Sequence, residues 1–124
     1  MGTLQGMTTP AKLKFTIYQG ATFRRPLRWL NPDKTPIDLT GCAARMQVRE
    51  DIDAPTVLLE LSTDNGRIAL GGTAGTVELL VDAVTTAAIA WESGVWDLEI
   101  AHPGGDVTRL AEGSISVRRE VTRG

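Results

Sequence analysis

His102 is the only histidine in the chain and is the first candidate for acid–base chemistry near neutral pH. It begins a His-Pro-Gly-Gly segment, which is typical of a turn. A catalytic role would need a carboxylate to orient the ring, such as Asp97 or Asp106. It would also need a nucleophile, such as Ser93 or Ser114, but neither serine lies in the Gly-x-Ser-x-Gly elbow that exposes such a group. We therefore predict a solvated turn histidine and no catalytic residues.

Cys42 is the only cysteine, which excludes a disulfide within the chain and any zinc site built from several cysteines. In the alternating pattern of this segment, Cys42 falls on the same strand face as Ala44, Met46 and Val48. A free cysteine on an apolar strand face is usually a small buried hydrophobe. We predict that Cys42 belongs to the core.

The acidic residues Glu50, Asp51 and Asp53 raise the question of a calcium site, because oxygen ligands at alternate positions occur in calcium loops. The glycine and the distant glutamate of an EF-hand are missing, and a solvated connection explains the segment equally well. The glycine-rich residues 71–75 lack the lysine of a phosphate-binding loop and predict a turn. We predict no metal site and no cofactor, although a weak calcium or sugar site stays open.

The elements that would position these residues are short strands. Apolar and polar residues alternate over short segments, most clearly over residues 42–49, with turn signals about every 8–12 residues. Residues 84–90 are alanine-rich and favour a short helix that Asp82 or Thr85 would cap. The repeated helices of a βαβ fold are missing from the pattern. We predict an all-β fold: a single-domain antiparallel β-sandwich, Ig-like or jelly-roll-like, with roughly eight or nine strands and at most one short helix near 84–90.

Three local signals refine this prediction. The Asn65-Gly66 pair predicts a type I′ hairpin turn, because both residues accept positive φ values. Pro26 lacks a backbone donor and therefore indicates an edge strand or a bulge. Gly113 predicts a bend or bulge between the last two strands.

The domain organisation follows from where this alternation starts and stops. We expect a flexible N-terminal arm over residues 1–11, the sandwich over 12–121, and a C-terminal tail over 122–124. The chain of 124 residues is 42% hydrophobic, which suffices for a core. The net charge of −2 argues against a protein that coats nucleic acid. No apolar run reaches the roughly 18 residues of a membrane span, and no secretion leader is recognisable, so we expect synthesis in the cytoplasm.

Basic and aromatic residues mark the candidate interface. Arg25 falls on the same strand face as Phe23 and Trp29. If that face is buried, Arg25 needs a carboxylate partner, such as Asp97 or Glu99; otherwise the face is exposed at an edge and meets another chain. Two of the three tryptophans should suffice for the core, which leaves one as a possible interface anchor. The predicted interface residues are Arg24, Arg25, Arg28, Trp29, Arg45, Gln47, Arg49, Arg118 and Arg119.

Several phrases of the sequence occur in an order that resembles a known group of proteins. They are QGATF (19–23), PIDLTG (36–41), ARMQVR (44–49), GRI (66–68), GVWDLE (94–99), EG (112–113) and EVTR (120–123). This order is similar to that of small β-domain structural proteins of tailed bacteriophages and prophages, including the N-terminal domain of phage baseplate upper proteins. The resemblance covers residues 18–123 and rests on turns and strand starts.

The resemblance implies a non-enzymatic virion structural protein, associated with the tail or baseplate, that acts through protein–protein contacts during particle assembly. Its partners would be other virion proteins and copies of itself, and its location would be the virion. Two alternatives stay open. One is a capsid decoration protein, and the other is a carbohydrate-binding β-sandwich that helps adsorption, which an exposed Trp91 or Trp96 in a groove with Asp or Asn would favour.

We predict that residues 1–11 and 120–124 become ordered only on assembly, because they lack an apolar period. Limited proteolysis should then cleave both segments in the free protein and spare them in the assembled one. Equal resistance in the two states would contradict this prediction.

Overall fold

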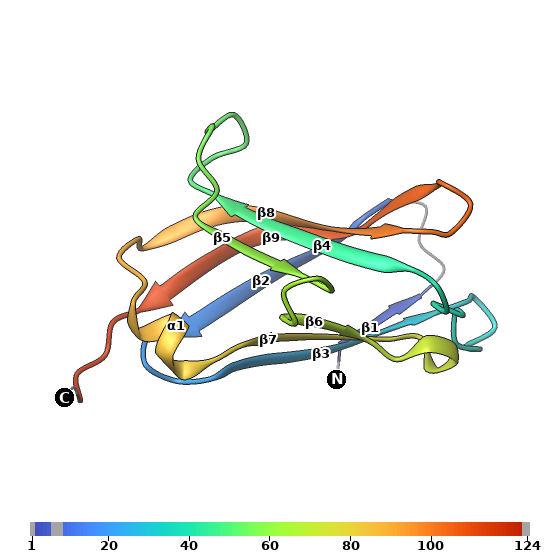
Figure 1. The fold of residues 1–124 in the computed structure, drawn as a ribbon, viewed down its shortest axis with the longest axis horizontal. Helices are drawn as coiled ribbons and strands as arrows, with labels where there is room; N and C mark the ends of the chain where they lie inside the picture. Colours follow the sequence, from blue (N-terminus) through green and yellow to red (C-terminus); the bar gives the residue numbers. More distant parts are fainter. Residues whose placement is uncertain (1, 6–8, 123–124) are drawn as a thin grey trace.

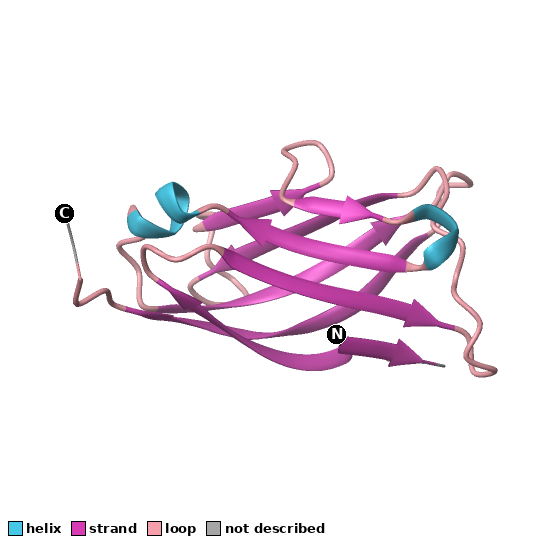
Figure 2. Ribbon diagram, turned by 90° about the horizontal axis from the view of Figure 1, so that it is seen from below, coloured by secondary structure: helices cyan, strands magenta, loops and turns pink. Residues whose placement is uncertain are grey.

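Alternating side chains give the longer strands one buried and one exposed face, and this alternation assembles two sheets around an apolar layer. The computed structural model of the protein describes residues 2–5 and 9–122. Figures 1 and 2 show the two sheets packed face to face, with the short helix Ala83–Ala87 at one end. Sheet A has the order β1 (Gly2–Gln5), β3 (Phe23–Leu30), β7 (Thr76–Val81) and β6 (Ile68–Leu70). Sheet B has the order β2 (Ala11–Tyr18), β9 (Val107–Arg118), β8 (Ser93–Ala101), β4 (Ala43–Arg49) and β5 (Leu59–Ser62).

This architecture confirms the predicted all-β, sandwich-like single domain, but both sheets are mixed. β1 runs parallel to β3 and β2 runs parallel to β9, whereas the other pairs are antiparallel. The strands β2 and β3 follow each other in the chain, yet they lie in different sheets. Because the chain changes sheet there, β2 is free to pair with the last strand in the same direction. Alternation of side chains specifies the face of a strand but not its direction, so the sequence did not reveal this.

The expected N-terminal arm needs a correction. Residues 2–5 form β1, and Leu4 is only 5% exposed because it packs into the core beside the edge of β3. One apolar residue and a row of backbone hydrogen bonds are enough to place a short edge strand, and neither produces a periodic signal. The sandwich also begins one residue early, since β2 starts at Ala11. Within the rest of the predicted arm and tail, residues 1, 6–8 and 123–124 lie outside the described residues.

The core is built from the inward side chains of both sheets. Leu27 and Leu79 from sheet A and Leu98 and Ile100 from sheet B are fully buried. The aromatic part of the core is a stack of Phe15 on Trp96, with ring centroids 4.6 Å apart and an interplanar angle of 8°. The indole Nε1 of Trp96 donates a hydrogen bond to the carbonyl of Ser114 at 3.0 Å, so its polar atom is satisfied inside the core.

The predicted short helix is present as α1 (Ala83–Ala87), and a 3₁₀ turn, η1 (Gly72–Ala74), follows β6. Asp82 caps α1 by accepting a hydrogen bond from the amide of Thr85 at 2.8 Å. Hydrogen bonding to Thr85 holds the pKa of the Asp82 carboxyl below its ordinary value. The buried Thr86 hydroxyl accepts from the amide of Gly20 at 3.0 Å and donates to the carbonyl of Ala21 at 2.8 Å. The helix is thereby fixed to the turn between β2 and β3.

The predicted hairpin at Asn65-Gly66 is wrong, because β5 and β6 lie in different sheets. Gly66 has a positive φ of 78°, but Asn65 does not, so the turn is not of type I′. The Asn65 side chain instead accepts from the amides of Ser62 and Arg67 and donates to the carbonyl of Glu60. Asparagine is used here to satisfy backbone groups where the chain leaves one sheet for the other.

The bend predicted at Gly113 is also wrong, since β9 continues through it. The irregularity lies earlier, where Leu98 pairs with Ala111 and Glu99 with Arg109, which leaves Leu110 as the additional residue. A Cβ atom on Gly113 would collide with the carbonyl oxygen of Leu13 in the neighbouring strand β2. Glycine is therefore required for the close approach of a parallel strand rather than for a bend.

Truncation of Leu98 to alanine removes a fully buried side chain from sheet B. We expect the free energy of unfolding to fall by about 2–5 kcal/mol, because apolar contacts are lost and a cavity is left. Urea denaturation measures this change. Ile52→Ala is the control, since Ile52 is 84% exposed, and we expect it to change the free energy by less than about 0.5 kcal/mol. Similar losses in the two variants would contradict the described core.

Candidate functional site

The nine predicted interface residues do not form one surface. Arg24 and Arg28 project from the outer face of sheet A, because they alternate with the buried Leu27 along β3. The side chains of β4 that alternate with its buried residues project from the outer face of sheet B, on the other side of the sandwich. These are Arg45, Gln47 and Arg49. Arg118 ends β9, and Arg119 follows it.

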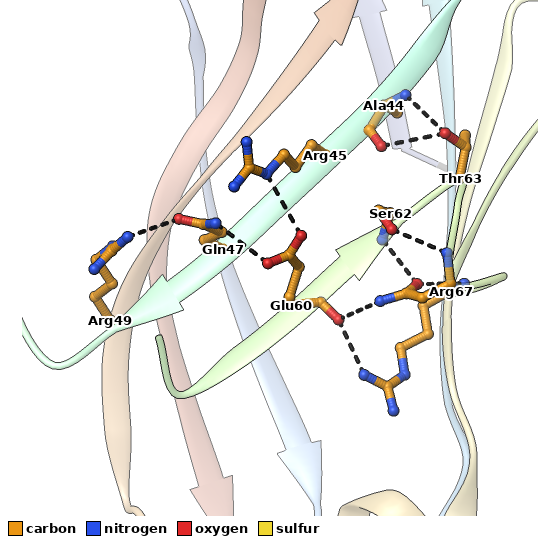
Figure 3. A network of polar contacts seen from close by, with 9 residues as sticks. Ala44, Arg45, Gln47, Arg49, Glu60, Ser62, Thr63 and Arg67 are labelled. Carbon is orange, nitrogen blue, oxygen red and sulfur yellow. Dashed lines mark hydrogen bonds and ion pairs between the residues drawn. The ribbon is translucent and has the colours of Figure 1, made fainter. Parts of the chain in front are cut away.

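The three β4 residues are joined in one polar network on the outer face of sheet B (Figure 3). Glu60 of β5 contacts Arg45 at 3.4 Å and accepts a hydrogen bond from Gln47 at 3.2 Å. Arg49 donates to the Gln47 side chain at 2.9 Å and to the carbonyl of Ala54 at 2.8 Å. These side chains therefore fix β5 and the connection between β4 and β5, in addition to facing solvent as predicted.

A second group of charges lies on the same outer face and was not singled out from the sequence. Arg109 of β9 lies 3.7 Å from Asp97 of β8 and 3.6 Å from Glu112, and Glu112 also pairs with Lys12 of β2. We call these four residues the ion-pair band. They border a shallow hollow of about 330 Å³ that Arg49 also lines. The sequence alone does not show this band. It follows from the register of β9 with its two neighbours, which places Lys12 of β2 and Asp97 of β8 on either side of Glu112.

Arg25 reaches the open side of the sandwich, where β2 of sheet B faces the start of β3 of sheet A. Its guanidinium carbon lies 5.5 Å from the centroid of the Phe15 ring, which is a cation–π contact. The side chain is exposed, so it needs no buried carboxylate. Of the two partners considered from the sequence, Asp97 lies beside Arg109 instead. A hollow of about 360 Å³ on this side is lined by Lys14, Phe15, Thr16, Tyr18, Thr22, Phe23, Arg24 and Arg25.

Two backbone edges border this open side. β2 pairs along its whole length with β9, and within residues 2–5 and 9–122 no strand pairs with its other edge. β1 pairs with β3 only from Leu27 onward, so the preceding residues of β3, including Pro26, have no neighbour on that side in the described part of the chain. The expectation that Pro26 marks an edge fits this register. Lys14 of β2 is an exposed charged residue on this side of the strand.

The tryptophans divide between core and surface. Trp96 is 4% exposed and belongs to the core, so it is not available to a ligand. Trp29 and Trp91 are half-buried and pack against the core. Trp91 borders a hollow of about 400 Å³ with Gln19, Glu92 and Arg119. This is where the structure places Arg119.

His102 lies in the turn after β8, as predicted, but its side chain is half-buried and makes contacts instead of being fully solvated. Its Nδ1 lies 3.6 Å from the Sγ of Cys42, and its Nε2 lies 3.0 Å from the Oγ1 of Thr108. Cys42 is half-buried and packs against the core, as expected, but its thiol faces this histidine. The two residues are 60 positions apart. They meet because Ala43 of β4 pairs with Ala101 of β8, a register that the sequence alone does not show.

The acidic segment 50–53 belongs to the connection between β4 and β5. The Asp51 carboxylate accepts a hydrogen bond from the amide of Asp53 at 3.0 Å. Over the described ranges, no three histidine, cysteine or acidic side chains come together as metal ligands would. The same ranges contain no helix with the length and hydropathy needed to cross a membrane.

Comparison with known proteins gives no family for the chain. No protein-family model and no curated protein matches it.

Substitution of Glu112 by glutamine tests the ion-pair band. The hydrogen bond and charge of Lys12, with a further contribution from Arg109, hold the pKa of Glu112 below its ordinary value of 4.5. Because folding lowers this pKa, the ionised Glu112 carboxylate stabilises the folded protein at pH values above its ordinary pKa. This stabilisation is lost as the pH falls through the pKa that Glu112 has in the folded protein. We therefore expect Glu112→Gln to lower Tm at pH 7 but to match the wild type near about pH 2. Thermal unfolding followed by circular dichroism measures both.

The matched control is Glu92→Gln, which removes an exposed carboxylate outside the band. It should leave Tm nearly unchanged at both pH values. An equal Tm difference for Glu112→Gln at the two pH values would show that the ionised carboxylate contributes nothing.

Proposed function

We propose that the protein is a non-enzymatic structural protein of a phage or prophage particle, associated with the tail or baseplate, and that it acts through protein–protein contacts during assembly. The resemblance of its turns and strand starts to small phage β-domains supports this proposal. The structural observation that carries it is the open side of the sandwich, where the free edge of β2 borders an apolar and basic hollow.

A free strand edge is a binding site of a particular kind. Its unpaired amides and carbonyls can add a strand from another chain, and the backbone hydrogen bonds supply affinity without a deep pocket. β2 offers eight residues for such pairing. Two aromatic residues of the hollow, the half-buried Phe23 and Tyr18, which is 60% exposed, give the incoming strand an apolar surface to cover.

The charge around the open side specifies what kind of segment would fit. Lys14 and Arg25 line its hollow together with Arg24, which also pairs with Glu78 at 3.8 Å, and no acidic side chain is among the lining residues. An acidic extended segment of another virion protein, or of a second copy, would be attracted to this side. The protein as a whole is slightly acidic, with a net charge of −2, which favours a protein partner over nucleic acid.

The other two readings draw less support. A capsid decoration protein could bind its partner through the same free edge of β2. The tail and capsid hypotheses therefore differ only in which virion protein is bound. A carbohydrate site would need an exposed tryptophan in a groove with Asp or Asn. The hollow beside Trp91 is lined by Gln19, Glu92 and Arg119 instead.

The first experiment asks whether the chain is part of a particle. Particles are induced from the bacterium that encodes the chain, purified, and separated into tails and heads for mass spectrometry. We expect the protein in the tail fraction, because the resemblance is to tail and baseplate proteins. Its presence only with heads would favour decoration, and its absence from both fractions would overturn the proposal.

The second experiment tests the open side with a matched pair of charge reversals. Lys14→Glu reverses a charge beside the free edge of β2, and Lys34→Glu reverses an exposed lysine in the turn after β3. We expect Lys14→Glu to reduce incorporation into particles several-fold through charge repulsion, and Lys34→Glu to have little effect. Equal incorporation of the two folded variants would exclude this edge as the docking site.

A further inference from the structure

The contact between Cys42 and His102 joins a nucleophile to a base. The Sγ of Cys42 lies 3.6 Å from the Nδ1 of His102, within hydrogen-bonding distance for sulfur. The other ring nitrogen of His102 lies 3.0 Å from the hydroxyl of Thr108. A nucleophile next to a base that a third group orients is the arrangement that activates thiols. This observation is independent of the open side and of the proposed function.

We propose that Cys42 is a reactive thiol that exchanges with small disulfides, with His102 as the proton acceptor. When Nε2 of His102 donates its proton to Thr108, the lone pair of Nδ1 faces the thiol. Transfer of the thiol proton to Nδ1 gives a thiolate beside an imidazolium, and the thiolate is the reactive form of cysteine. Thr108 is a positioning residue in this arrangement, because it acts only through the ring.

The surrounding backbone holds both groups in place. The turn after β8 is closed by hydrogen bonds from the His102 amide to the carbonyl of Asp106 at 2.8 Å and from the Gly105 amide to the carbonyl of His102 at 2.9 Å. Cys42 immediately precedes β4, and its amide donates to the carbonyl of Leu39 at 3.0 Å. The Trp29 ring lies 6.1 Å from the imidazole, at a tilt of 57°. These contacts restrict the ring and the thiol before any reagent arrives.

The surroundings also limit the kind of substrate. Cys42 is half-buried in a connection that precedes β4, so part of it is accessible from solvent. None of the three hollows described above includes Cys42 among its lining residues. A small disulfide can reach such a thiol without a shaped pocket, whereas a large substrate would find few groups to hold it.

The exchange between the Cys42 thiol and the disulfide needs no other oxidant or reductant. The Cys42 thiolate attacks one sulfur of the disulfide, a new S–S bond forms to Cys42, and the S–S bond of the reagent breaks. Cys42 is oxidised as the second sulfur of the reagent is reduced and leaves as a thiolate. The proton that His102 took from Cys42 then passes to the leaving thiolate or to solvent.

The test uses the full chain and 5,5′-dithiobis(2-nitrobenzoic acid), whose leaving thiolate is coloured. The rate at pH 7 is measured for the folded protein and for the same protein unfolded in urea, where Cys42 is an ordinary thiol. We expect the folded protein to react about tenfold faster than the unfolded chain, because only the folded chain holds His102 beside the thiol as a proton acceptor. Mass spectrometry should find one adduct on Cys42, and Cys42→Ser should not react.

Two variants separate activation from a merely structural contact. His102→Gln keeps a polar side chain but removes the base, and it should lower the folded-state rate about tenfold. Asp106→Asn, in the same turn, should leave the rate unchanged within about twofold. If His102→Gln proves unstable, Thr108→Val serves instead and should lower the rate by a smaller factor, because it removes only the positioning hydroxyl. A folded wild type that reacts no faster than the unfolded chain, or a folded His102 or Thr108 variant that keeps the full rate, would overturn the proposal.

Discussion

The parallel pairing of β2 with β9 is the contact on which the other features of the molecule depend. It requires glycine at position 113, because any side chain there would collide with the backbone of Leu13. It brings Phe15 onto Trp96 in the core, and it brings Lys12 to Glu112 on the outer face. It also leaves the other edge of β2 free beside the start of β3. Core, ion-pair band and open side are thus three consequences of one strand contact.

Local chemistry made part of the fold predictable. Alternation indicated most of the strands, and the preference of short polar residues for helix starts gave Asp82 and Thr85 as candidate caps of α1, of which Asp82 is the cap. Contacts between distant residues were not predictable in this way. The turn at Asn65 and Gly66 has the composition of a hairpin, yet it connects two sheets, because the partner of each strand is decided by the whole core. β1 was missed because an edge strand can be held mainly by backbone hydrogen bonds, which leave no pattern in the side chains.

The same distinction applies to the candidate sites. The solvent-facing positions of β4 were correctly assigned, but their partner Glu60 could be named only from the register. The sequence predicts Cys42 as a core residue and His102 as a solvated turn residue but gives no link between them, because 60 positions separate them. Their contact needs β4 and β8 to be neighbours. A function that rests on pairs of residues is therefore harder to foresee from one sequence than a fold that rests on periodicity.

The direction of β2 relative to β9 also has a mechanical meaning. Ala11 lies opposite Ala111 and Tyr18 opposite Arg118, so the start of β2 and the end of β9 are at opposite ends of the same pair. A stretching force applied through these two points would pull the strands past each other lengthwise. All hydrogen bonds between them would then bear the load together, whereas strands peeled apart from one end break their bonds one after another. The sandwich is therefore constructed to resist tension along the chain between residues 11 and 118.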